Sequence, residues 1–201
     1  MSRPLPYCSP AQRASAPSVH IVRSLLEKHA PADQGEADSL RRIAELVART
    51  PEPFSRRQYA PGHLTASAIV VAPQREATLL VFHSRLQRWL QPGGHFESGE
   101  VDPALAAARE VIEETGAPTR WPGLVPVLLD VDVHTIPARP GEPAHCHFDL
   151  RLLLLAELSE ARAGEGVTAA RWLRSADLMT MDLDPGLQRA LWKAGMLEGG
   201  G

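Results

Sequence analysis

One stretch, Gly93 to Gly116, constrains what this chain can fold into more than any other part of the sequence. It starts with two adjacent glycines and ends in a run of alanines and charged residues. Asp102 is a good helix N-cap, and Pro103 suits the first helical position because its missing N–H would be unpaired there anyway. Gly116 can adopt the left-handed conformation that ends a helix. The stretch therefore predicts a glycine-rich loop followed by a helix.

The predicted helix carries three carboxylates on one face. Glu110, Glu113 and Glu114 are spaced i, i+3 and i+4, so their side chains lie together and repel each other. Oxygen-rich clusters of this kind suit hard divalent cations such as Mg²⁺. Arg109 lies one turn before Glu113, where an i, i+4 ion pair would orient that glutamate. A solvated acidic face would also explain the glutamates, but not the glycines. The opposite face is expected to pack into a core through Leu105, Ala108, Val111 and Ile112.

The stretch resembles the signature of the Nudix hydrolases, Gly-x5-Glu-x7-Arg-Glu-x2-Glu-Glu-x-Gly. The matching residues are Gly94, Glu100, Arg109, Glu110, Glu113, Glu114 and Gly116. One departure is an extra residue between Glu100 and Arg109, where Val101 to Ala108 make eight residues instead of seven. The insertion falls at the helix start, so a loop can absorb it without rotating the glutamates relative to each other. It leaves the direction of Glu100 open.

The resemblance implies an α/β fold, the Nudix α/β/α sandwich, in which a mixed sheet lies between helices and the signature forms a loop-helix-loop. It also implies a pyrophosphohydrolase that uses Mg²⁺, with Mn²⁺ as an alternative. The implied metal ligands are Glu110, Glu113, Glu114 and the main-chain carbonyl of Gly94. Arg109 would orient a glutamate, and Glu113 and Glu114 would take part in catalysis. Glu165, in a later loop, is the first candidate for the base, and Glu97 is the second.

The sequence divides into three segments. Residues 1–17 are rich in proline and predict a loosely held tail. Residues 18–60 predict a helical extension, with helices over about 19–29 and 37–49. Residues 61–198 are expected to form the Nudix domain. The signature does not imply the two N-terminal helices, which would serve as a covering layer, a homodimer contact or part of the substrate site.

The expected domain alternates strands and turns around the signature. Strands are predicted over residues 63–72, 77–83, 125–134, 145–157 and 168–173, and helices over 176–179 and 185–197. Alternation places Asp130, Asp132 and His134 on one face of their strand. It also places His145, His147, Asp149 and Arg151 on one face of the next strand. Two predicted neighbouring strands thus each present a polar, titratable face.

These polar residues have more than one interpretation. His145, His147 and Asp149 would form the wall of a substrate cleft, a separate Zn²⁺ site completed by His134 or Asp132, or ordinary polar surface. Arg85 and Arg88 are candidates for phosphate contacts, with solvated side chains as the alternative. Trp89 would either stack on a base or belong to the core. Cys146 alternates onto the apolar face and is interpreted as an unreactive core residue.

Composition excludes several other classes. A length of 201 residues suits one domain of ordinary size. A net charge of −3 gives no reason to expect a nucleic-acid polymer as partner. Two cysteines, Cys8 and Cys146, are too few for a disulfide framework. The sequence contains no secretory signal and no apolar run of the ~18 residues that a membrane helix needs. A cytoplasmic location is therefore expected.

The favoured substrate is a nucleoside diphosphate linked to another group, such as a nucleotide-sugar or an ADP-ribose-like compound. The wide polar strand faces suggest room for a second polar group. The alternatives are hydrolysis of nucleoside triphosphates in nucleotide clean-up and a non-catalytic Nudix domain that senses nucleotides. Isomerisation of a prenyl diphosphate is a less favoured hypothesis. That reaction would require a reactive cysteine near the site, and the positions of Cys8 and Cys146 in the sequence do not suggest one.

Overall fold

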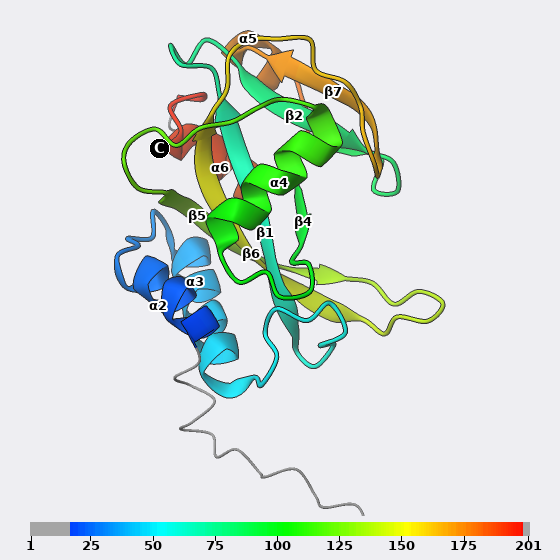
Figure 1. The fold of residues 1–201 in the computed structure, drawn as a ribbon. Coiled ribbons are helices and arrows are strands. Elements are labelled where there is room, and N and C mark those ends of the chain that lie inside the picture. The colour runs from blue at the N-terminus through cyan, green and yellow to red at the C-terminus, as the bar shows by residue number, and fades with distance from the viewer. Residues whose placement is uncertain (1–16, 199–201) are drawn as a thin grey trace, which may run out of the picture.

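The computed structural model describes residues 17–198 (Figure 1). The tail predicted for residues 1–17 lies outside the described residues except for Pro17, which begins the first helix. The helices are α2 (Pro17–Glu27), α3 (Gln34–Arg49), α4 (Pro103–Thr115), α5 (Ser175–Leu178) and α6 (Pro185–Lys193). The strands are β1 (Gly62–Val71), β2 (Thr78–His83), β3 (Arg88–Leu90), β4 (Gly93–His95), β5 (Val127–Ile136), β6 (His145–Leu155) and β7 (Val167–Leu173).

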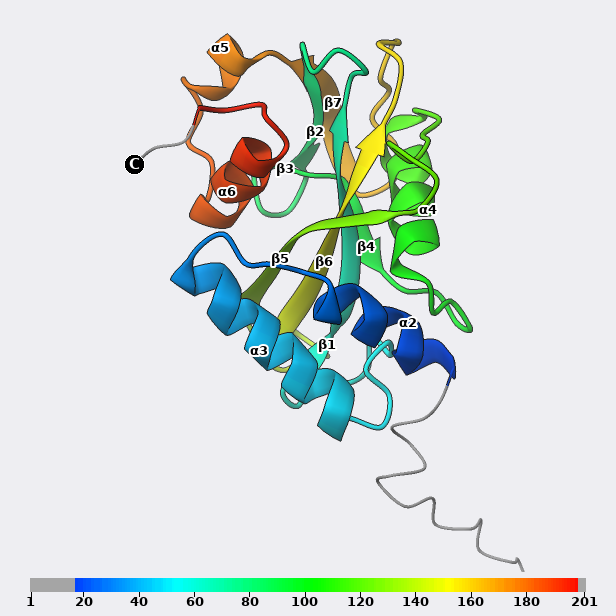
Figure 2. The same cartoon turned by 90° about the vertical axis from the view of Figure 1, so that its left-hand side faces the viewer.

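The strands form one mixed seven-stranded sheet. Its main path runs β3-β2-β1-β6-β5, with β4 paired to β1 and β7 paired to β2. β1 and β6 are parallel, and the other pairs are antiparallel. Helix α4 covers one face of the sheet and α6 covers the other, as the view along the β5 edge shows (Figure 2). This arrangement confirms the α/β/α sandwich that the signature predicts.

The two faces of β1 explain where the site lies. Leu64 and Ala66 point into a core that they share with α4 and the N-terminal helices. On the other face, Ile69 and Val71 pack in a second core with α6. Successive side chains of a strand alternate between faces, so every second residue of β1 lies on the face of Ile69 and Val71. In the first half of β1 the residues on that face are polar. These residues, His63, Thr65 and Ser67, are not part of the second core.

The N-terminal helices are part of the folded unit. Residues of α3, including Ile43, Leu46 and Val47, are buried in the same core as Leu64 of β1. The Asp33 carboxylate caps α3 by accepting a hydrogen bond from the Glu36 N–H at 2.7 Å. Residues 17–198 contain no helix with both the length and the apolarity that a membrane crossing requires.

The prediction for the apolar face of α4 is partly wrong. Leu105 and Ile112 are 59% and 52% exposed instead of lying in the core. The helix buries Ala104, Ala107 and Val111. Small alanines allow α4 to lie close to the sheet, and this orientation brings its glutamate edge toward β4.

Part of the predicted glycine loop is a strand. Gly93, Gly94 and His95 pair with Ser67, Ala66 and Thr65 of β1. A short strand β3 precedes this segment and pairs with β2. The remaining predicted elements exist, with ends that differ by up to four residues.

Candidate active site

The two glycines of β4 allow the signature helix to approach the sheet closely. A Cβ on Gly94 would lie 2.7 Å from Oε1 of Glu110. A Cβ on Gly93 would lie 2.3 Å from the Cβ of Ser67. A side chain at position 93 would collide with β1, and one at position 94 would push the Glu110 carboxylate away. Gly93 is therefore required by its close approach to β1, and Gly94 leaves room for the Glu110 carboxylate.

Arg109 holds the carboxylates of the signature together. Its Nη1 donates to Glu110 at 3.0 Å and to Glu113 at 2.8 Å. Its Nε and Nη2 donate to the two oxygens of Glu100 at 3.3 and 3.0 Å, and Nη2 also donates to the His95 carbonyl at 2.9 Å. The i, i+4 pair with Glu113 is as predicted. Despite the extra residue before the helix, the Glu100 side chain points to Arg109.

The pKa values of Glu100, Glu110 and Glu114 shift in different directions. Burial raises the pKa of Glu114 to about 8, and the negative charges of Glu110 and Glu113 add to this shift. The Gly93 N–H donates to Glu114 at 3.0 Å and offsets it only in part. Burial also raises the pKa of Glu110 despite its contact with Arg109. Burial acts in the same direction on Glu100, but hydrogen bonds from Arg109 outweigh it and the net pKa is lowered.

The glutamates face a cavity of about 1130 Å³. Its lining joins the signature residues to the polar face of β1, β6 and β5. On that face the strand register places Thr65 beside Asp149 and places Asp132 on the other side of Asp149. The cavity thus has acidic residues on one wall and hydroxyl, carboxylate and imidazole groups on another.

Asp149 is held by a network of hydrogen bonds. It accepts from the hydroxyl of Thr65 at 3.0 Å and from that of Ser67 at 2.7 Å. The Arg151 guanidinium donates to it at 3.3 Å and to Asp130 at 3.0 Å. Gln91 donates to the same Asp149 carboxylate at 3.2 Å. The network orders the floor of the cavity.

The predicted site residues are distributed unevenly around the cavity. Arg85, Arg88 and Glu165 line it with exposed side chains. His147 and Asp149 also line it, whereas His145 is buried and is not among the described residues of the lining. The loop that carries Glu165 is tied to the end of α4, where the Gly164 N–H donates to the Glu114 carbonyl at 2.9 Å.

Four residues of this region were missed by reasoning from the sequence: His63, Thr65, Gln91 and His95. His63, Thr65 and His95 belong to the sheet rows that contain His147 and Asp149. The alternation within β1 places His63 and Thr65 on one face, and this could be predicted from the sequence. The parallel register between β1 and β6 could not be predicted, because it joins residues more than 80 positions apart.

The structure also shows the surroundings of Trp89 and Cys146, for which the sequence offered a core position. Trp89 is half-buried, packs against the second core and meets Phe82 edge-on, with the Arg171 guanidinium 5.6 Å from its ring centre. It thus belongs to the periphery of the core. Cys146 is partly buried against the first core, and Nη2 of Arg42 lies 3.5 Å from its Sγ.

Comparisons with known proteins identify the family of this fold. The model of the NUDIX domain family matches residues 61–192. A NUDIX-family hydrolase from Clostridium perfringens is 23% identical, with a TM-score of 0.51, over 70% of this chain and 97% of that one. The NUDIX domain of Shewanella oneidensis NrtR, complexed with ADP ribose, is 19% identical, also with a TM-score of 0.51, over 76% and 96%.

A third structure, a MutT NUDIX hydrolase from Burkholderia pseudomallei, is 27% identical over 65% of this chain and 95% of that one, with a TM-score of 0.47. No curated protein matches the chain at a significant level of sequence similarity. The family model covers well over half of the chain and includes the whole glutamate cluster. It confirms the family and the enzyme class that the signature predicts: the chain belongs to the Nudix family of hydrolases.

Proposed function

We propose that this protein hydrolyses the diphosphate linkage of a nucleoside diphosphate joined to a second polar group, such as a nucleotide-sugar or an ADP-ribose-like compound. The observation that carries the proposal is the size and lining of the cavity. Its volume of about 1130 Å³ exceeds the ~300–1,000 Å³ of ordinary small-molecule sites. One wall supplies carboxylates for a metal-bound diphosphate, and the polar sheet face offers hydrogen bonds to a second group.

The residues present fit Mg²⁺ or Mn²⁺. Glu110, Glu113, Glu114 and the Gly94 carbonyl would be the ligands, and all offer oxygen atoms. Burial raises the pKa values of Glu110 and Glu114, and the charges of neighbouring glutamates add to both shifts, so a bound cation would favour the ionised cluster. When bound, the cation would neutralise charge on the diphosphate and lower the pKa of the attacking water.

The chain's own residues would position the reaction. Arg109 would orient Glu110 and Glu113 without contacting the substrate. Arg85 and Arg88 line the cavity and would pair with phosphate oxygens. Glu165 lines the same cavity and stays our candidate for the base that takes a proton from water. His147 and Asp149 lie on the wall that would face the group beyond the diphosphate. A cytoplasmic location and a homodimer stay predictions.

The Nudix domain of Shewanella oneidensis NrtR was solved with ADP ribose, which is a ligand of the proposed class. A direct test measures turnover of nucleotide-sugars, ADP-ribose, dinucleoside polyphosphates and nucleoside triphosphates, with Mg²⁺ and with Mn²⁺. Hydrolysis of the proposed class adds one water and yields two monophosphates, which chromatography detects. Nucleoside triphosphates would instead yield a monophosphate and pyrophosphate.

Wild type and Glu113→Gln are compared in each reaction. Selective turnover of diphosphate-linked compounds that is lost in the variant would support the proposal. Preferential turnover of triphosphates would replace it with nucleotide clean-up. Metal-dependent binding of nucleotides without any turnover would replace it with nucleotide sensing.

A further inference from the structure

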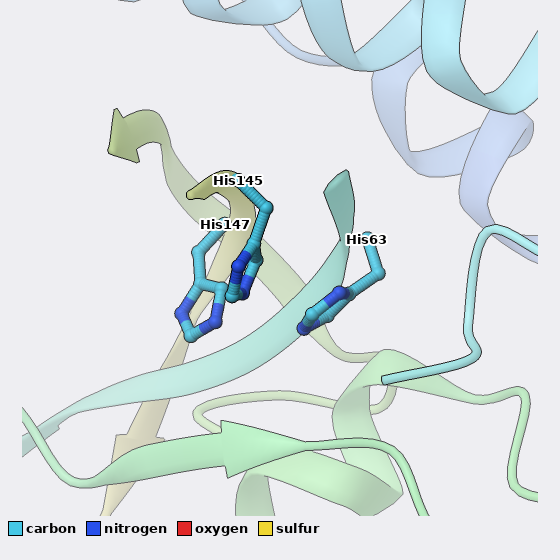
Figure 3. Close-up of side chains that lie close together, drawn as sticks. All are labelled: His63, His145 and His147. Atoms are coloured by element: carbon cyan, nitrogen blue, oxygen red, sulfur yellow. The ribbon is translucent and has the colours of Figure 1, made fainter. Parts of the chain in front are cut away.

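Three histidines converge beside the proposed catalytic cavity. His63 lies at the start of β1, and His145 and His147 lie at the start of β6, its parallel neighbour. Their ring centres are 5.0 to 5.3 Å apart. Each residue offers one ring nitrogen within 4.8 Å of the other two. Figure 3 shows His63 pointing across from β1 toward the two rings on β6.

Hydrogen bonds orient two of these rings. Nδ1 of His63 lies 3.0 Å from the Gln58 carbonyl, and Nδ1 of His145 lies 2.8 Å from the Pro143 carbonyl. A carbonyl oxygen can only accept, so Nδ1 carries the hydrogen in both rings and Nε2 presents a lone pair. Histidines that ligate metals typically donate their other N–H to a carbonyl or carboxylate in this way.

The lone pair of His63 has no partner. The residue is only 1% exposed, and no group within the described residues 17–198 makes a hydrogen bond to its Nε2. A buried polar atom without a partner is unfavourable, because it has lost its hydrogen bond to water. A cation between the three rings would satisfy it.

Burial favours the neutral form of His63 and of His147, which is the form that binds metals. Burial lowers the pKa of His63, and the charge of a protonated His145 or of Arg56 would lower it further. Burial lowers the pKa of His147 to about 2, with contributions from the neighbouring histidines.

We propose that His63, His145 and His147 form a second metal site, separate from the glutamate cluster, that takes a divalent transition metal, with Zn²⁺ preferred. Imidazole nitrogens suit Zn²⁺, whereas Mg²⁺ requires oxygen ligands. Zn–N bonds of about 2.0–2.1 Å place tetrahedral ligand atoms about 3.3 Å apart, so small side-chain rotations close the site.

The remaining polar groups nearby leave the fourth position open. Asp149 shares the strand face with the histidines, but Thr65 and Ser67 bind its carboxylate. The ring centre of His95 lies 5.1 Å from that of His63 and 5.0 Å from that of His147, and the ring centre of His134 lies 5.5 Å from that of His147. Neither ring belongs to the group whose nitrogens all lie within 4.8 Å of one another. Of the three proposed ligands, His147 lines the cavity. We therefore expect the fourth ligand to be a water or an oxygen of a molecule bound in the cavity.

The experiment titrates Zn²⁺ and Co²⁺ into metal-free protein in an excess of Mg²⁺, which occupies carboxylate sites. We expect about one tightly bound Zn²⁺ per chain and, with Co²⁺, the strong visible absorption of a four-coordinate ion. His147→Ala should weaken binding at least ~10-fold, because it removes one of three ligands. His134→Ala is the matched control, since it removes a neighbouring imidazole outside the ligand set, and it should bind as wild type does.

Glu113→Gln separates the two sites and should retain the Zn²⁺. Loss of Zn²⁺ in that variant, or unchanged binding in His147→Ala, would overturn the proposal, as would the absence of tight binding in wild type. Ring-nitrogen NMR of the wild type does not depend on any variant folding. Zn²⁺ should shift the Nε2 signals of His63 and His145, and unshifted signals would count against the site.

Discussion

Glu36 on α3 and Glu114 on α4 are both buried glutamates, 0% and 8% exposed, but their pKa values shift in opposite directions. Burial alone raises the pKa of Glu36, yet its hydrogen bonds outweigh burial and the net pKa is well below the ordinary value. His29 Nε2 donates to Glu36 at 2.7 Å and the Ala32 N–H at 2.6 Å, and Lys193 donates as well.

Glu114 lacks comparable partners. One backbone N–H donates to it, and its charged neighbours in the cluster are Glu110 and Glu113. Arg109 contacts both of those glutamates but is not bonded to Glu114. Burial and repulsion from Glu110 and Glu113 therefore both disfavour the ionised form of Glu114.

The difference separates structural from functional acids in this fold. An acid surrounded by cations joins elements together, and around Glu36 these are α3, the segment before it, and α6. An acid surrounded by acids destabilises the fold unless a cation binds, so such a cluster is a candidate functional site. Substitutions in the two regions should consequently affect different measurements.

The largest effect is expected for Glu110→Gln. It removes one proposed metal ligand but keeps the size of the side chain beside Gly94. Activity should fall by more than about 100-fold, since losing even an outer partner of a metal site costs about 10- to 100-fold. The melting temperature should stay close to that of wild type. Initial rates and thermal unfolding measure the two quantities, and a rate within a few-fold of wild type would remove Glu110 from the metal site.

Glu36→Gln should have the opposite profile. It leaves buried donors and Lys193 without their carboxylate, and breaking a buried ion pair costs about 3–5 kcal/mol of unfolding free energy. The fraction that remains folded should keep its activity. Glu45→Gln in the same helix breaks an exposed pair with Arg41 and should cost less than about 1 kcal/mol.

The loss in Glu36→Gln should also depend on pH in a defined direction. The folded pKa of Glu36 lies below its usual value of 4.5, so the stabilisation it provides is present above pH 4.5. It is lost as pH falls further and the carboxylate is protonated. Denaturant unfolding from pH 7 to pH 3 should therefore show the two proteins converging. A constant difference down to pH 3 would mean that the charge of Glu36 is not what stabilises the fold.

Arg109→Lys tests whether the glutamate cluster depends on the geometry of its one arginine, whereas Glu36 is held by several separate donors. Lysine keeps the charge but cannot reach Glu100, Glu110 and Glu113 with a planar fork. Turnover should fall by about 10- to 100-fold. The Mg²⁺ concentration for half-maximal rate should rise, which a purely structural role would not produce. An unchanged Mg²⁺ dependence would argue against Arg109 as a positioning residue.

Local signals made much of this fold predictable. Asp102 and Gly116 determine the ends of α4 through capping, and the structure has both: the Asp102 side chain accepts from Ala104 N–H and Gly116 is left-handed. Strand alternation correctly placed the polar face that includes Asp149. Spacing on a helix predicted that Arg109 pairs with Glu113. Each of these depends on residues close in sequence.

Features set by distant partners were not predictable. Leu105 and Ile112 are apolar, but which helix face is buried depends on the strands beneath it. Glu36 lies in the first turn of α3, where an acid is typical of an exposed helix start, but it is buried and pairs with Lys193, 157 positions away. His63 joins His147 only through the parallel register of β1 and β6. Long-range pairing thus determined both the structural network and the histidine cluster.

The most specific effect is expected for Glu114→Gln without divalent cations. The folded pKa of Glu114 is raised from 4.5 to about 8, so the folded protein retains a proton there that the unfolded chain loses. Wild-type stability should therefore decline from pH 4.5 to about pH 8. Glutamine stays neutral and should remove this decline, so the variant should be as stable as wild type at pH 5 and more stable at pH 9.

Added Mg²⁺ should reverse the order at pH 9. It binds the ionised cluster of the wild type and stabilises the folded state in proportion to its affinity, whereas the variant has lost one ligand. Thermal unfolding at both pH values, with chelator and with Mg²⁺, measures all four states. If chelated wild type and variant share one pH profile, Glu114 is already compensated within the fold. The contrast with Glu36 would then rest on Glu110 and Glu113, whose charges remain crowded around Arg109 alone.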